Sequence, residues 1–138
     1  MNNECNYGSP YELGHFLKNG SLRENNSRVH WKTFFPPEEI GDTSLEVSCF
    51  EVQTLRSSEV FDIADNPNKP ILMNNKPPVG YCVVTEEDFI TTSLLLDFND
   101  IPPRHVNIKG WEQFPNKEDR IMKATQLAEC ASQKIFLR

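Results

Sequence analysis

Residues 116–135 read NKEDRIMKATQLAECASQKI, and the apolar side chains in this stretch recur at the spacing of one helix face. Asn116 stands just before the first periodic residue and is a typical helix N-cap. A single apolar stripe has to be buried against another element, so the stretch predicts a long C-terminal helix that lies across a sheet. The residues of the stripe are Ile121, Ala124, Leu127, Ala128, Ala131 and Ile135.

The strands of that sheet are predicted from shorter apolar runs upstream. In residues 44–52, Leu45, Val47 and Cys49 alternate with polar side chains, which is the period of a half-buried strand. Other runs are rich in β-branched and aromatic residues and are predicted as strands or extended segments. They are residues 29–35, 80–84 and 93–98, with 104–108 as the last strand.

Short helices are predicted between these strands. In residues 9–17, Ser9 is a plausible N-cap, Pro10 suits the first helical position, and Gly20 follows the apolar face. A second helix starts at a cap on Ser57, and Thr85 with Asp88 has the spacing of a capping box for a third.

The order of these elements predicts the fold class. Strands and short helices alternate without a regular βαβ rhythm or a glycine-rich phosphate turn, so we expect an α+β fold with a small, mainly antiparallel sheet packed against the C-terminal helix. A chain of 138 residues with 38% hydrophobic content suits one ordinary domain. We expect a flexible N-terminus over residues 1–8 and a single domain over residues 9–138.

Charge and cysteine usage narrow the class of protein. The net charge of −6 disfavours nucleic-acid binding through phosphate neutralisation alone, although a local basic patch would still permit it. Four separated cysteines without a C-x-x-C pair predict buried reduced thiols and no zinc site: Cys5, Cys49, Cys82 and Cys130. The absence of a leader-like start or a long apolar run predicts a cytoplasmic protein with no membrane partner.

One stretch of the sequence carries a resemblance to other proteins. Residues 104–111 read RHVNIKGW, and together with residues 34–37 and 44–52 they resemble a group of small uncharacterised bacterial proteins. The shared stretch is Arg-His-x-Asn-Ile-x-Gly-Trp, and the similarity covers roughly residues 28 to 131. Here Glu112 stands where the pattern has proline, and Glu51 stands where it has an arginine. The resemblance implies no known activity.

Two of the three histidines stand beside cations and suggest phosphate chemistry. His30 is near Lys32, and His105 follows Arg104. Metal-free phosphodiester cleavage needs an acid, a base and a fixed cation, and histidine can serve as either acid or base near neutral pH. We therefore expect binding of, or action on, a phosphate-bearing ligand such as RNA or a nucleotide, with His30 and His105 catalytic and no cofactor. The expected ligand-binding residues are Lys32, Arg104, Asn107 and Trp111.

Other enzymatic interpretations have less support in the sequence. His30, Tyr81 and Glu86 or Glu87 have the order of residue types found in an NAD cleft for ADP-ribosyl transfer. The residues around the Pro102-Pro103 turn lack a spacing that fixes a metal polyhedron, so no metal is expected. Neither Ser48 nor any cysteine occupies a strand-to-helix elbow, so the sequence does not indicate a nucleophile.

The alternative is a non-catalytic interaction module or a subunit of a larger bacterial complex. The segment Gly110–Pro115 carries two large aromatic residues, Trp111 and Phe114. Exposed, they would form a hot spot for a partner or a platform for a base; buried, they would close the end of the sheet under the helix. An acidic surface suits a basic protein partner.

Overall fold

The structure is a computed structural model that describes residues 11–36 and 47–138, and within these ranges six strands form one sheet. The strand order is β6-β7-β4-β1-β5-β8, and every neighbouring pair is antiparallel. The strands are β1 (Glu12–Leu17), β4 (Val47–Glu51), β5 (Gly80–Thr85), β6 (Leu95–Asp97), β7 (His105–Lys109) and β8 (Ile135–Leu137). The α+β class with a C-terminal helix on the sheet is therefore confirmed.

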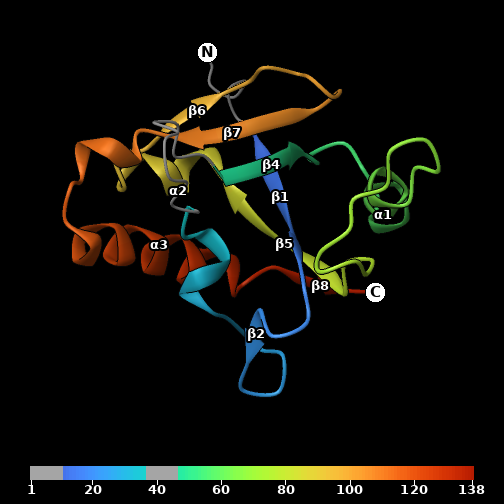
Figure 1. The fold of residues 1–138 in the computed structure, drawn as a ribbon, viewed down its shortest axis with the longest axis horizontal. Coiled ribbons are helices and arrows are strands. Elements are labelled where there is room, and N and C mark those ends of the chain that lie inside the picture. Colours follow the sequence, from blue (N-terminus) through green and yellow to red (C-terminus); the bar gives the residue numbers. More distant parts are fainter. Residues whose placement is uncertain (1–10, 37–46) are drawn as a thin grey trace, which may run out of the picture.

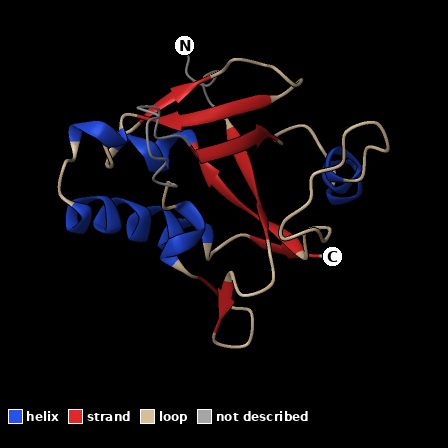
Figure 2. Cartoon of the chain, in the orientation of Figure 1, coloured by secondary structure: helices blue, strands red, loops and turns tan. Residues whose placement is uncertain are grey.

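Helices cover both faces of this sheet. Figures 1 and 2 show α3 (Lys117–Ala131) and the 3-10 helix η1 (Trp31–Phe34) on one side and α1 (Ser57–Ala64) on the other. We call these the α3 face and the α1 face. A separate hairpin of β2 (Leu22–Arg23) and β3 (Arg28–Val29) extends from the α3 side. The remaining helices are α2 (Glu86–Ile90) and η2 (Trp111–Gln113).

The predicted C-terminal helix is confirmed, but it ends earlier than its stripe suggests. Asn116 is the N-cap, and Leu127 lies at 0% exposure in the core between α3 and the sheet. Ile135 does not belong to the helix: it lies in β8, opposite Cys82 of β5. The chain turns after Ser132, and the β-branched and aromatic residues that follow pair with the open edge of β5.

The helix predicted over residues 9–17 is wrong, because residues 12–17 form the central strand β1. Leu13 and Leu17 pack on the α3 face, and Phe16 packs on the α1 face. A strand that is buried on both faces shows no polar alternation, so its apolar spacing also fits a helix. The proposed cap residues Ser9 and Pro10 lie outside the described residues.

The other local predictions are largely confirmed. Strands β4, β5, β6 and β7 lie where the runs predicted them, although residues 44–46 lie outside the described part. Thr85 and Asp88 form the predicted capping box of α2. Two details differ: Arg56 rather than Ser57 is the N-cap of α1, and residues 31–34 are 3-10 helix rather than strand.

The cysteines in the described part of the chain are free thiols, as predicted. Burial raises the pKa of Cys49 to about 12 and the pKa of Cys82 well above its ordinary value. Such thiols remain protonated and inert at neutral pH. Cys5 lies outside the described residues. Among the helices that the structure describes, none has the length and apolar character needed to cross a bilayer.

Candidate functional site

A group of basic side chains surrounds the hairpin and the start of η1. The backbone N–H of His30 donates to the Ser21 carbonyl at 2.8 Å, which ties the end of β3 to the start of β2. The Nδ1 atom of His30 accepts from the backbone N–H of Lys32 at 3.1 Å, and its ring stacks on Trp31 at 5.4 Å. These contacts fix the imidazole beside the side chain of Lys32.

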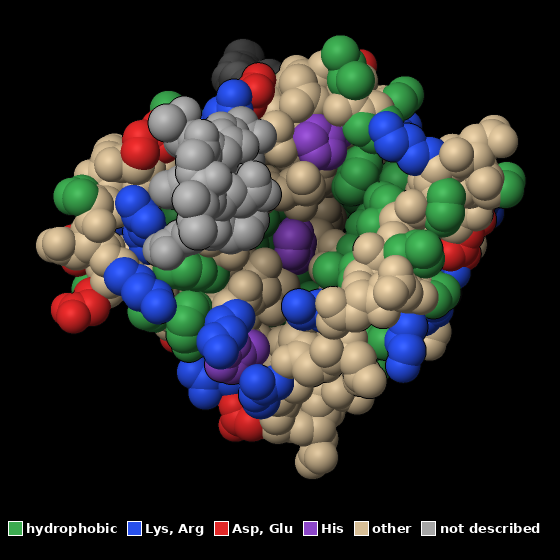
Figure 3. Space-filling view, in the orientation of Figure 1, with side chains coloured by type: hydrophobic (Ala, Val, Ile, Leu, Met, Phe, Trp, Pro, Cys, Tyr) green, Lys and Arg blue, Asp and Glu red, His purple; other side chains and the backbone are tan. Residues whose placement is uncertain are grey.

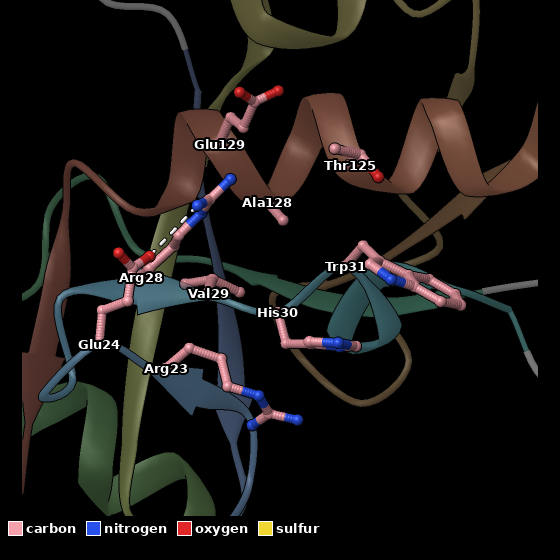
Figure 4. Close-up of a pocket in the computed structure, with 9 residues that line it drawn as sticks. All are labelled: Arg23, Glu24, Arg28, Val29, His30, Trp31, Thr125, Ala128 and Glu129. Atoms are coloured by element: carbon pink, nitrogen blue, oxygen red, sulfur yellow. Dashed lines mark hydrogen bonds and ion pairs between the residues drawn. The ribbon is translucent and has the colours of Figure 1, made fainter.

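Two adjoining cavities share His30 and Arg23 as wall residues. The first, of about 220 Å³, lies between the hairpin, η1 and α3 and is shown in Figure 4. Its walls include the apolar side chains of Val29, Trp31 and Ala128. The second cavity, of about 150 Å³, is also lined by Lys18 and Lys32. We call the wall formed by Lys18, Arg23, His30 and Lys32 the basic groove.

The charges of the basic groove act on one another. Burial first, and then the positive charges of Arg23 and Lys32, lower the pKa of His30 below 6.5. Arg28, which also lines the first cavity, is not counted in the basic groove. It forms an ion pair with Glu24 at 3.2 Å and points toward α3 (Figure 4). Figure 3 shows Lys and Arg side chains gathered beside a histidine in the lower part of the view. The groove is thus locally basic in a chain with a net charge of −6.

The second predicted histidine lies elsewhere, on β7 at the polar end of the α1 face. Nε2 of His105 is 3.1 Å from Ser48 Oγ, and its Nδ1 is 2.9 Å from Asn99 Oδ1. Arg104 precedes it and donates to the Glu51 carbonyl at 3.4 Å, and Asn107 lies opposite Ser48 in the β4–β7 register. The sites therefore separate into two groups: His30 with Lys32, and Arg104, His105 and Asn107 around β7. Neither cavity of the basic groove includes His105.

Trp111 does not meet the expectation of a ligand-binding side chain, because it has 0% exposure. Its indole Nε1–H donates to the Ile108 carbonyl at 3.0 Å, so its polar atom is satisfied inside the core. Phe114 is half-buried under Lys123, whose Nζ lies 5.0 Å from the ring centroid. The segment Gly110–Pro115 thus follows the second alternative and closes the end of the sheet under α3.

The other enzymatic interpretations find no common site. Tyr81 is buried on the α1 face and donates to Ser57 Oγ, whereas His30 follows β3 on the α3 side. Glu86 and Glu87 occupy the first turn of α2. Within residues 11–36 and 47–138, no three acidic, histidine or cysteine side chains gather where they could hold a metal ion.

His15, which the sequence did not single out, lies on β1 where its pairing with β4 stops. The last register pair of these strands is Gly14 with Phe50. Beyond it, His15 Nδ1 donates to the Ser48 carbonyl at 2.7 Å, so an imidazole replaces the next ladder hydrogen bond. Burial lowers the pKa of His15, despite the opposing effects of hydrogen bonds to the Ser48 and Thr33 carbonyls.

Sequence reasoning missed Lys18, Arg23 and Asn99, and it considered Ser48 as a nucleophile but set it aside. Lys18 and Arg23 reach the basic groove only because β1 is a strand and residues 22–29 form a hairpin. Ser48 and Asn99 meet His105 through pairing of β4 with β7 and through the loop before β7. The separations of 57 and 6 residues follow no catalytic motif, so no local signal pointed to them.

Comparison of the chain with protein-family models, curated proteins and solved structures finds no match. The resemblance through residues 104–111 therefore stays a prediction.

Proposed function

We propose that the protein binds a phosphate-bearing ligand, specifically a nucleotide, in the basic groove. The observation that carries the proposal is the convergence of Lys18, Arg23, His30 and Lys32 on adjoining cavities of an acidic chain. Like charges close together repel unless an anion lies between them, so such a cluster suits a phosphate.

The shape of the groove favours a small ligand with one flat ring system. The apolar walls at Val29, Trp31 and Ala128 suit a base. Arg23 and His30 line both cavities and, with Lys32 of the second cavity, suit the phosphates. At about 220 Å³ the first cavity is smaller than the roughly 300–1,000 Å³ of a pocket for a drug-sized molecule. The first cavity would therefore hold the base alone, with the phosphates against the basic side chains of the second cavity.

This proposal changes the role expected for His30. His30 and His105 belong to separate groups of contacts, so the proposal assigns His30 to binding and not to acid–base cleavage with His105. The lowered pKa leaves the His30 imidazole mainly neutral at neutral pH. A phosphate beside it would offset the charges of Arg23 and Lys32, and the pKa of His30 would rise on binding.

The test is a titration of the purified protein with ATP and, separately, with adenosine. ATP should bind and adenosine should bind far more weakly. Arg23→Gln and Lys32→Gln should each weaken ATP binding by about tenfold, because each removes a charge-assisted contact. Lys117→Gln, at the exposed start of α3, is the control and should bind like the wild type.

The pKa of His30 supplies an independent readout. Its imidazole signals, followed by NMR across pH, should titrate at a higher pH when ATP is present. Equal affinity for ATP and adenosine, or wild-type binding by Arg23→Gln, would refute the proposal. Stronger binding of a single-stranded RNA oligomer than of ATP would also overturn the choice of a mononucleotide.

A further inference from the structure

Three side chains at the polar end of the α1 face form a chain of hydrogen bonds. Ser48 Oγ lies 3.1 Å from His105 Nε2, and His105 Nδ1 lies 2.9 Å from Asn99 Oδ1. A hydroxyl, an imidazole and a group that orients the imidazole are the parts of an activated serine nucleophile, and such a site is recognised by geometry, not by chain order.

The hydrogen bonds of Asn99 settle which nitrogen of His105 carries the proton. Asn99 Oδ1 also accepts from the backbone N–H of Ile101 at 3.0 Å, which identifies this atom as the oxygen of the amide. An oxygen without hydrogen can only accept, so the Nδ1 atom of His105 must donate to it. When the ring is neutral, Nε2 is its acceptor nitrogen, and the Ser48 hydroxyl donates to it.

The backbone holds these groups in place while leaving the serine accessible. His105 lies directly opposite Phe50 in the β4–β7 register, and the two rings contact edge to face at 5.5 Å. The backbone N–H of His105 donates to the Pro102 carbonyl at 3.0 Å, which closes the loop before β7. Ser48 itself is exposed, so a substrate can reach its oxygen.

A mainly apolar cavity lies beside Phe50 and Arg104, and its lining includes neither Ser48 nor His105. It has a volume of about 360 Å³ and shares Phe50 with the contacts of His105. Ser48 is two residues from Phe50 on the same face of β4, or about 7 Å along the strand. Ile63 and Ile71 form part of its wall, and Pro102 with Pro103 forms another part. The cavity can hold an acyl chain or an aromatic ring beside Phe50, whose ring contacts His105.

We propose that Ser48 is the nucleophile of a carboxylic-ester hydrolase, with His105 as its general base and Asn99 as a positioning residue. The proposal goes beyond nucleotide binding and uses none of the basic groove. Its substrate class is a neutral ester whose apolar acyl group enters the cavity beside Phe50. Asn107, opposite Ser48 in the register and on the same sheet face, is the amide donor assigned to the oxyanion.

The reaction balances without a metal or cofactor. Ser48 Oγ forms a bond to the carbonyl carbon, and its proton passes to His105 Nε2. The ester C–O bond breaks, and the leaving alcohol takes that proton. Water then attacks the acyl-serine and gives a proton to Nε2; release of the acid returns the proton to Ser48.

The test uses an alkyl fluorophosphonate, which labels activated serines, and p-nitrophenyl butyrate as a chromogenic ester. Mass spectrometry of the labelled wild type should find the adduct on Ser48, and the protein should hydrolyse the ester. Ser48→Ala should abolish both, whereas Ser58→Ala, a change at another exposed serine, should alter neither. Ser48→Ala should have the same thermal unfolding temperature as the wild type, which would show that the substitution leaves the fold intact.

The role of Asn99 has its own readout. Asn99→Ala should slow labelling roughly tenfold or more, while Asn99→Asp should retain most of the rate, because a carboxylate still accepts from His105 and Ile101. If Asn99 had only a structural role, Asn99→Ala and Asn99→Asp variants of equal stability would be labelled at the same rate.

An unlabelled wild type, an adduct on another residue, or activity that survives Ser48→Ala would overturn the proposal. Arg23→Gln should label normally, so the failure of nucleotide binding and the failure of this site are distinguishable.

Discussion

The two faces of the six-stranded sheet bury different kinds of side chain. On the α3 face, Leu13, Val106 and Trp111 belong to one continuous apolar core under the long helix. On the α1 face, among residues 11–36 and 47–138, an apolar cluster surrounds Phe16 and Tyr81, and the polar side chains of Ser48 and His105 lie beyond it. Substitution of an exposed polar side chain costs less packing energy than substitution of a core residue. The continuous apolar core and the proposed ester-hydrolase site therefore lie on opposite faces, while the proposed nucleotide site lies on the α3 side.

The largest stability effect should come from the α3 face. Trp111→Ala removes the largest side chain of the fully buried set and leaves a cavity, so the free energy of unfolding should fall by about 3–5 kcal/mol. Urea unfolding measures this, with Trp31→Ala as the matched change at a half-buried tryptophan. Equal losses of unfolding free energy in Trp111→Ala and Trp31→Ala would contradict the special contribution of the α3-face core.

A smaller effect should follow from crowding at the edge of the sheet. A Cβ on Gly80 would lie 2.6 Å from the Phe136 carbonyl oxygen, so Gly80→Ala should push β8 from β5 at a cost of about 1–3 kcal/mol. Gly14→Ala should cost less, because its Cβ would meet a side-chain methyl group of Val52. Faster amide exchange of residues 135–137 in Gly80→Ala alone is the expected sign, and unchanged exchange would contradict it.

The next effect depends on pH, through His15. Its native pKa is lowered below 6.5, so the unfolded chain binds the proton first as the pH falls. The contribution of His15 is fully present above pH 6.5 and is lost as the pH falls from there toward the lowered native pKa. The slope cannot exceed about 1.4 kcal/mol per pH unit for one proton.

Urea unfolding at about pH 8 and about pH 5.5 measures this effect. His15→Gln removes the titration and keeps a donor for the Ser48 carbonyl. The variant should lose less stability on acidification than the wild type. A variant that loses as much would show that other groups carry the pH dependence.

The smallest effect should come from the polar end of the α1 face. Ser48→Ala should change the free energy of unfolding by less than about 0.5 kcal/mol, because the side chain is exposed. Val47→Ala, one residue earlier but pointing into the α3-face core, should cost several times more. Comparable losses from these neighbours would remove the distinction between the faces.

The elements that were easiest to predict from the sequence are those whose apolar residues mark one buried face. The stripe of α3 reports one buried face, and the alternation of Val47 and Cys49 reports the α3 face of β4; both elements exist as predicted, although α3 ends before Ile135. Strand β1 is buried on both faces, so its periodicity was ambiguous and a helix was predicted instead. Ile135 continued the helical spacing, and only the free edge of β5 decided that it joins a strand.

The sites were less predictable than the fold. The proximity of His30 to Lys32 follows from a local hydrogen bond across two residues. The contact between His105 and Ser48 depends on the β4–β7 register, which nothing in either segment specifies alone. Trp111 was predicted to contact a ligand, because a tryptophan suits a binding surface as well as a core. Its burial follows from packing against α3 and the sheet, which the local sequence does not show.

The strand order also constrains how the chain can acquire its structure. In the six-stranded sheet of the described residues, β6 and β7 are the one pair of neighbours that follow one another directly among the named strands, whereas β1 lies between β4 and β5. Strand β1 is thus synthesised well before β4 and β5, and its apolar side chains stay exposed until those strands pair with it. Pairings that span so many residues slow folding, and an early exposed strand favours aggregation. During synthesis, the apolar side chains of β1 therefore emerge before the strands that cover its edges.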